Sequence, residues 1–458
     1  MKIKLKNIGT LKQAEIDLSK DLIVLAGPNN TGKTYAAYTV YGVCDLLRIS
    51  YKYRLKDNKN VENLDSILSN VIKNPFEKTF QVTEIAEMFI DSIPEFLKEN
   101  ILAQLRNIFA VDVTKFEDAN VTILFDKNKI IEHLINTEVL SDDILTLDKM
   151  KITKSIGESY FKYRVENKSE EQFGNFKAII ALQQFNSKAI INLYFNNLYI
   201  NTAERSAINI FSKELSIKRN NIVDQLLELR DTKNGDANQL LGKLQRYPLP
   251  IRDSLVIAED LANLSRNRSE FGFLADRIEE VLLDGKINIS KDGEVQYSPN
   301  KSKVKNLSIH LTASIVKSLS NLVFYFRHLA QKGDFIIIDE PELNLHPDNQ
   351  RKVARLFGEI INQGFKVMIS THSDYIIREI NNLVMLKSGG EKANDLIKKY
   401  GYEEKQLIDH QRVGAYLFKN NRNYDIEVTE TGFEVNTIDE EINNLNNASE
   451  DIYFTLFD

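Results

Sequence analysis

Residues 27–34 read Gly-Pro-Asn-Asn-Thr-Gly-Lys-Thr, a combination of residue types that can bind a triphosphate. An apolar stretch at 22–26 predicts a strand before this run, and a helix is predicted from about Tyr35 onward. Glycines let successive backbone N–H groups point at phosphate oxygens, and a helix N-terminus adds partial positive charge. Lysine can reach the β- and γ-phosphates, and the threonine hydroxyl can bind Mg²⁺. The expected nucleotide-binding residues are Gly27, Asn29, Asn30, Thr31, Gly32, Lys33 and Thr34, with Thr34 also a metal ligand.

Two adjacent carboxylates, Asp339 and Glu340, follow a second apolar segment. Residues 335–338 are apolar without interruption, which is typical of a strand buried on both faces of a parallel sheet. Open α/β sheets bind their ligands at the carboxyl ends of the strands. We therefore expect Asp339 to hold Mg²⁺, directly or through water, and Glu340 to act as the catalytic base toward the attacking water. Together with the glycine-rich loop, this pair predicts a nucleotide hydrolase.

A third predicted strand, at 365–370, ends in Thr371-His372-Ser373. A histidine at a strand end, judged by itself, is more often structural than catalytic. The order of the three motifs resembles the ABC-type ATPases of the SMC, RecF and OLD-like group. Those proteins carry GxNxxGKT, then four apolar residues with DEPExxLHPxxQ, then THS, which match residues 27–34, 336–350 and 371–373 here. The resemblance implies ATP as the nucleotide and a catalytic role for His372 as the sensor of the γ-phosphate.

The same resemblance suggests roles for two further residues. Residues 202–206 read Thr-Ala-Glu-Arg-Ser, similar to the Pro-Ala-Glu-Arg-Ser of the OLD-like group with the proline replaced. It implies that Arg205 brings positive charge to the phosphates, whereas the alternative is an ordinary Glu-Arg pair at a helix start. In ABC-type ATPases a serine-rich helix start touches the γ-phosphate held by the opposite subunit. Ser314 is the candidate here, although the usual glycine is missing, and a plain N-cap is the alternative.

Composition limits the classes of protein to consider. The chain has 458 residues, 43% of them hydrophobic, which is enough for a sizeable core. A single cysteine, Cys44, excludes a disulfide framework and a thiolate zinc site. Because no early apolar run resembles a signal peptide or a membrane span, we expect a cytoplasmic protein with no membrane partner. The formal net charge of −6 gives no global attraction to nucleic acid, but it leaves room for a local basic surface.

These observations predict an α/β fold, an ABC-type P-loop ATPase head with a mostly parallel sheet, an antiparallel lobe, a helical insertion and a small C-terminal α/β segment. The core strands are expected at 22–26, 335–338 and 366–370. An Asp-Gly hairpin is expected at 287–297. The expected division places the N-terminal half of the head at 1–205 with a helical insert at about 46–110, a helical hairpin or arm at 206–285, the C-terminal half at 286–388 and an acidic cap at 389–458.

The biological role is open between several hypotheses. Nucleases of the OLD family continue into a Toprim domain with an Asp-x-Asp, and no such tripeptide follows His372 in this sequence. We therefore expect a homodimer or larger oligomer around ATP that controls a separately encoded effector, such as a nuclease or toxin, in defence against phage. The alternative is a RecF-like DNA-repair ATPase, in which residues 266–268 and 301–305 contact the phosphate backbone. A third hypothesis is a scaffold that uses nucleotide only as structural glue.

Overall fold

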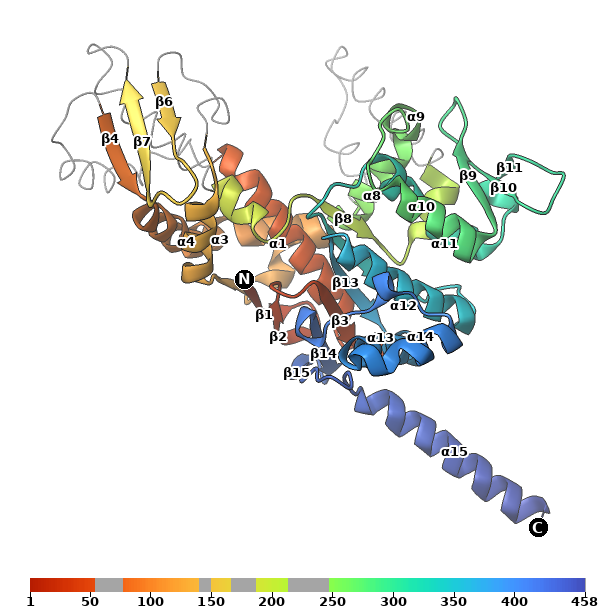
Figure 1. Cartoon of the computed structure of the whole chain (residues 1–458). Helices are drawn as coiled ribbons and strands as arrows, with labels where there is room; N and C mark the ends of the chain where they lie inside the picture. Colours follow the sequence, from red (N-terminus) through yellow and green to blue (C-terminus); the bar gives the residue numbers. More distant parts are fainter. Residues whose placement is uncertain (54–76, 140–149, 166–186, 213–246, 458) are drawn as a thin grey trace, which may run out of the picture.

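A nine-stranded sheet forms the centre of the molecule, with strand order β5-β1-β2-β15-β14-β3-β13-β12-β8 (Figure 1). The computed structural model describes residues 1–53, 77–139, 150–165, 187–212 and 247–457, and all that follows concerns these residues. The strands of this sheet are β1 (Lys2–Ile8), β2 (Leu11–Asp17), β3 (Leu22–Ala26), β5 (Asn120–Leu124), β8 (Leu198–Asn201), β12 (Phe335–Asp339), β13 (Lys366–Thr371), β14 (Val413–Lys419) and β15 (Arg422–Ile426).

The sheet has a parallel part and an antiparallel part, as the sequence predicted. Strands β14, β3, β13, β12 and β8 pair in parallel, whereas β5, β1 and β2 pair antiparallel. The register places Asp339 opposite Ser370, and Thr371 opposite Ala26. The carboxyl ends of β3, β12 and β13 therefore meet at one edge of the sheet, where the three sequence motifs begin.

Helices cover both faces of the parallel strands, because those strands are apolar on both sides. Ile23 and Leu25 of β3 join one core cluster, and Leu22, Val24 and Ala26 join the other. The first cluster is built with α1 (Lys33–Tyr53), α3 (Val82–Phe109) and α4 (Lys127–Asn136). The second is built with α10 (Gly272–Ile278), α11 (Ser314–His328), α12 (Pro347–Asn362) and α13 (Asp374–Ser388).

The described part of the insert expected at 46–110 is mainly helical, and it also supplies one strand that we did not expect, β4. This strand joins two strands from residues 150–165 in a three-stranded antiparallel sheet of order β4-β7-β6, seen beside α3 and α4 in Figure 1. The strands are β4 (Glu77–Gln81), β6 (Met150–Thr153) and β7 (Tyr160–Val165). The strand β4 was not predicted, because its pairing with β7 is a contact between residues far apart in the sequence. Residues 54–76 of the expected insert lie outside the described residues.

The expected arm at 206–285 is described only in part, since residues 213–246 lie outside the described residues. Its described helices are α8 (Leu249–Glu259), α9 (Leu261–Leu264) and α10. Pro248 stands at the N-cap of α8 and so precedes this helix. The expected hairpin is present as β9 (Gly285–Ile289) and β10 (Val295–Pro299), with β11 (Leu307–Ser308) beside them. Gly293 takes a φ of +75° in its turn, a conformation that glycine adopts without strain.

The C-terminal segment is not the separate cap that the sequence suggested. Strand β14 lies between β3 and β15 in the main sheet, and Val413 and Ala415 are buried in the core. The correction has a physical cause, because an apolar strand is stabilised most where both of its faces and both of its edges are covered. Helices α14 (Asn394–Tyr400) and α15 (Asn436–Phe457) complete the segment, and α15 extends away from the rest of the chain (Figure 1).

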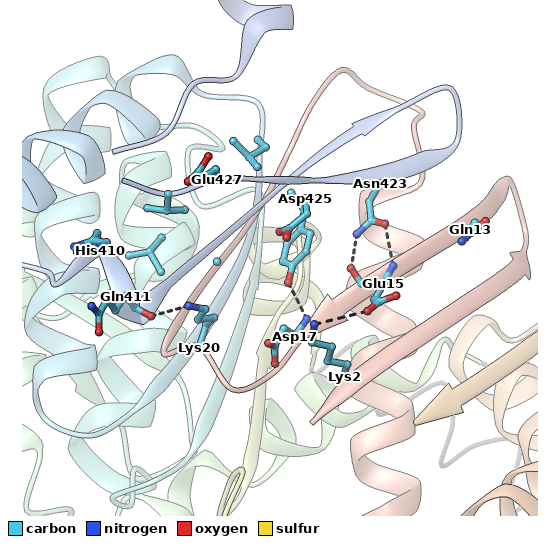
Figure 2. Close-up of a pocket in the computed structure, with 15 residues that line it drawn as sticks. Lys2, Gln13, Glu15, Asp17, Lys20, His410, Gln411, Asn423, Asp425 and Glu427 are labelled. Atoms are coloured by element: carbon cyan, nitrogen blue, oxygen red, sulfur yellow. Dashed lines mark hydrogen bonds and ion pairs between the residues drawn. The ribbon is translucent and has the colours of Figure 1, made fainter. Parts of the chain in front are cut away.

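A cavity of about 720 Å³ lies where β2 and β15 diverge. These strands pair in parallel only at Gln13 and Arg422. Farther along, the Asn423 side chain accepts from the backbone N–H of Glu15 at 2.9 Å and donates to its carbonyl at 2.7 Å (Figure 2). This amide therefore takes the place of backbone pairing across the gap. The described lining includes none of the site residues expected from the sequence.

No described helix combines the length and the apolar character that crossing a membrane requires.

Candidate functional site

The loop after β3 has the backbone conformation that its glycines allow. Gly27 has a φ of +135°, and a Cβ there would lie 2.3 Å from the carbonyl oxygen of Phe418 in β14. Gly32 has a φ of +98°, a region that L side chains rarely adopt. The first glycine is thus required by the C-terminal strand that packs beside the loop. The loop then leads directly into the N-terminus of α1, where backbone N–H groups are available for an anion.

Lys33 begins α1 and lies over the loop. Its Nζ donates to the carbonyl oxygens of Gly27 at 2.8 Å and Pro28 at 2.7 Å. Burial lowers the pKa of Lys33, and the nearby carboxylates of Glu340 and Asp339 oppose that shift. The ammonium group is therefore held at the loop by weak neutral acceptors, so that a triphosphate can replace them as stronger partners.

Thr34 and Asp339 come together as the sequence predicted for a pair of metal ligands. The Thr34 hydroxyl lies 3.4 Å from Asp339 Oδ1, although 305 positions separate the two residues. The Ser370 hydroxyl donates to the same oxygen. A hydroxyl and a carboxylate oxygen fit Mg²⁺, which usually takes one or two protein oxygens and completes its octahedron with phosphate and water. Burial raises the pKa of Asp339 to about 6.

Glu340 follows in an unusual backbone conformation. Its φ is +50°, in the left-handed region that costs an L residue about 1–2 kcal/mol. Its backbone N–H donates to the Ser370 carbonyl at 3.0 Å. The strain turns the chain sharply at the end of β12, so that Asp339 and Glu340 both stay at the sheet edge where the loop of Lys33 lies.

Arg205 holds this turn from the other side. Its guanidinium donates to the carbonyl oxygens of Asp339 at 2.8 Å, Glu340 at 2.7 Å and Thr202 at 3.0 Å. The side chain is 1% exposed. This differs from the expectation that Arg205 contacts phosphate, because both terminal nitrogens are already committed to backbone carbonyls. The rigid fork of an arginine suits such fixed acceptors, and here it links β8 to the carboxylate turn.

His372 is positioned by Glu342, a residue to which the sequence analysis assigned no role. Glu342 Oε1 accepts from the His372 backbone N–H at 2.8 Å and lies 3.4 Å from Nδ1. Glu342 is 7% exposed, and its Oε2 has no hydrogen-bond partner among the described residues. The imidazole itself is exposed at the sheet edge. The carboxylate therefore positions the Nδ1 side of a ring that is otherwise exposed.

Two other functional candidates went unrecognised, one next to a motif identified in the sequence and one at the end of such a motif. Ser370 precedes the Thr-His-Ser tripeptide and contacts Asp339. Gln350 ends the long motif, and its Oε1 accepts from the Ser373 hydroxyl at 2.5 Å. Their positions in the sequence could have indicated them. Ser370 ends the predicted strand at 365–370 and Gln350 ends the motif at 336–350, and both segments are expected to lie close to the other motifs.

Ser314 is the first residue of α11, and it is exposed. The N-cap is Ala313, whose methyl group cannot cap, so the alternative that Ser314 serves as an ordinary N-cap is wrong. Its contact with a nucleotide on another subunit stays a prediction.

Three residues of the basic clusters considered for DNA have partners within the chain. Arg268 contacts the His328 ring nitrogen at 3.1 Å, and Lys301 pairs with Asp284 at 3.0 Å. Lys305 donates to the Pro299 carbonyl at 3.2 Å. These contacts favour the structural interpretation of the clusters over a phosphate-binding one.

Replacing Asp339 with asparagine should stabilise the protein in the absence of Mg²⁺ and nucleotide. The folded pKa of about 6 exceeds the usual 3.8, so the native state favours the protonated acid. The protonated carboxyl group of Asp339 therefore contributes to the free energy of unfolding. This contribution is fully present below pH 4 and is lost as pH rises through 6, which lowers the free energy of unfolding by at most about 3 kcal/mol. The free energy of unfolding, measured in urea, should therefore be higher for Asp339→Asn than for the wild type at pH 8 and equal to it near pH 4. The control Asp292→Asn, in an exposed turn, should have nearly the stability of the wild type at either pH. An Asp339→Asn protein that is less stable than the wild type at pH 8 would contradict the raised pKa of Asp339.

Three comparisons place the chain among known proteins. A family model described as AAA ATPase domain matches residues 1–377. A putative ABC transporter ATP-binding protein of Listeria monocytogenes is 31% identical over 103 residues, which make up 20% of this chain and 38% of that protein. The cell division ATP-binding protein FtsE of Streptococcus pneumoniae is 30% identical over 79 residues, 17% of this chain and 34% of that protein. The chain thus matches little more than a third of either relative.

Among solved structures, the Smc head domain derived from Pyrococcus furiosus, with an extended coiled coil and bound to the C-terminal domain of ScpA, aligns over 98% of both chains. It is 13% identical, with a TM-score of 0.31. The family match covers most of the chain and includes all three motifs that meet at the sheet edge. The chain therefore belongs to the AAA ATPase domain family.

Proposed function

We propose that this chain is a Mg²⁺-dependent ATPase that closes around ATP as a homodimer or larger oligomer and regulates a separately encoded effector in antiphage defence. The main support for ATP hydrolysis is the contact between Thr34 and Asp339, which lies next to Lys33 and Glu340. Segments from both ends of the chain supply these groups, and the parallel sheet aligns them. A scaffold that used nucleotide only as glue would not need a carboxylate base beside this pair.

Each residue has a distinct part in the proposed reaction. Lys33 leaves the Gly27 and Pro28 carbonyls and donates to the β- and γ-phosphate oxygens. Thr34 and Asp339 would hold Mg²⁺, and the ion would supply positive charge to the phosphates. Glu340 accepts a proton from the attacking water, and His372, oriented by Glu342, donates toward the γ-phosphate.

Two exposed features support self-association. His372 is exposed, so the side of the site on which it lies is open in a single chain, and Ser314 is exposed at the start of α11. The free N–H groups at the start of α11 suit an anion supplied by another subunit. The role in defence rests on the resemblance of residues 27–34, 336–350 and 371–373 to the OLD-like group.

Glu340→Gln should bind ATP with near-wild-type affinity yet hydrolyse it at least 100-fold more slowly, since the amide cannot accept the proton from water. The trapped ATP should accumulate a dimer or larger assembly, measured by light scattering with and without ATP. Lys33→Ala, the matched control, should lose ATP binding and stay in its nucleotide-free form. A Glu340→Gln protein that remains monomeric under both conditions would defeat the oligomer proposal, and unchanged ATP affinity in Lys33→Ala would defeat the site.

Arg205→Lys should separate positioning from phosphate binding. Lysine keeps the charge but cannot donate to three carbonyls in the fixed fork geometry, so the turn of Asp339 and Glu340 should relax. We expect kcat to fall at least tenfold while the Kd for ATP changes less than about threefold. Thermal unfolding checks that the variant is folded. A folded variant with strongly weakened ATP binding and an intact kcat would instead indicate direct contact with phosphate.

The defence role predicts a gene for a nuclease or toxin beside the gene for this chain. Expressed together in a phage-sensitive host, the pair should lower plaque formation at least 100-fold. Protection should disappear with Lys33→Ala in this chain or with removal of the neighbouring gene. Protection by this chain alone, or none from the pair against a broad phage panel, would count against a separate effector.

A further inference from the structure

Helix α15 presents a row of apolar side chains to solvent. Leu445 is 68% exposed, Ile452 58% and Leu456 67%. Figure 1 shows the helix extending away from the rest of the molecule. A helix without tertiary packing is marginally stable in water, so a partner that covers this row would stabilise the helix. The exposed row therefore needs an explanation that the nucleotide site does not supply.

The spacing of these side chains is that of a helix-packing seam. From Ile442 the steps lead to Leu445, Ser449, Ile452 and Leu456, which alternate three and four residues. Such a row remains on one face of a helix over several turns and fits the surface of another helix or a helical groove. Tyr453 lies beside the row and is 57% exposed, and it contacts Phe454 and Phe457 on the other side of the helix. Aromatic side chains of this kind are typical anchors in protein interfaces.

All the charged side chains of this helix are acidic. Residues 436–458 contain six acidic side chains and no lysine, arginine or histidine. Because the whole chain has 59 basic and 65 acidic residues, residues 1–435 are balanced at 59 of each. The entire formal net charge of −6 thus belongs to α15 and the residue after it.

This charge decides between classes of partner. Nucleic acid and anionic membrane surfaces would be repelled. A second copy of α15 would bring two acidic helices together with no cation on either to compensate. A protein surface with an apolar groove and basic residues on its rim fits both features at once.

We propose that α15 is a docking helix that inserts this seam into an apolar groove, rimmed by lysine and arginine, of a different protein. It rests on the proposed function only in identifying that protein as the effector. The nucleotide site lies at the edge of the central sheet, so the docking helix and the site are separate surfaces of the chain.

A designed peptide tests this chemistry without knowledge of the natural partner. The probe is a fluorescent 28-residue heptad peptide with isoleucine and leucine at the seam and lysine at the flanking positions, and the comparison peptide has glutamate at those positions. Fluorescence anisotropy with the full chain should show at least 30-fold tighter binding of the lysine peptide. Its Kd should rise at least tenfold between 50 and 500 mM NaCl, because charge pairs on the rim are screened.

Matched double variants locate the binding surface. Leu445→Asp with Ile452→Asp should weaken binding at least 30-fold, whereas Asn444→Asp with Asn447→Asp adds the same charge away from the seam and should keep it. Equal binding of both peptides, or binding that survives the seam variant, would overturn the proposal. The proposal would also be overturned if the wild-type chain were a dimer without ATP and the seam variant were a monomer, because α15 would then bind a second copy of itself. ATP hydrolysis should be unchanged in both variants, so failure of the docking proposal and of the ATPase proposal remain distinguishable.

Discussion

The alignment of three parallel strands, β3, β12 and β13, is the constraint on which the rest of the structure depends. Their register places Ala26 beside Thr371, and Ser370 beside Asp339. Each strand is buried on both faces, so a shift by one residue would turn apolar side chains into the wrong core cluster. Apolar packing on both faces thus determines where the polar groups at the strand ends meet.

Function at this edge opposes stability. Asp339 is ionised at neutral pH in a buried place, and Glu340 has a left-handed backbone. Arg205 and Ser370 offset these costs by donating to the backbone and to the carboxylate of the same turn. Within the described part of the chain, Oε2 of Glu342 has no hydrogen-bond partner and is a further unfavourable group close to His372. Such concentrations of strain and buried charge are typical of functional sites.

Charge and chemistry are divided between different parts of the chain. Residues 1–435 carry balanced charge and contain the nucleotide site, whereas α15 carries the net charge and an apolar seam. Because residues 1–435 have no net charge, their nonspecific attraction to nucleic acid is limited. Recognition of a partner can then depend on a short helix whose sequence changes without disturbing the sheet.

By itself the sequence determined the glycine-rich loop, the buried strands, the carboxylate pair and the Thr-His-Ser strand end. Each has a local signal, either an apolar run or a fixed spacing, and the structure confirms the strands and the meeting of Thr34 with Asp339. Only the tertiary structure decided that β14 lies beside β3, that Arg205 donates to the backbone carbonyls of the carboxylate turn, and that Glu342 contacts His372. These contacts join residues 30 to nearly 400 positions apart, and such pairings leave no trace in local composition or period.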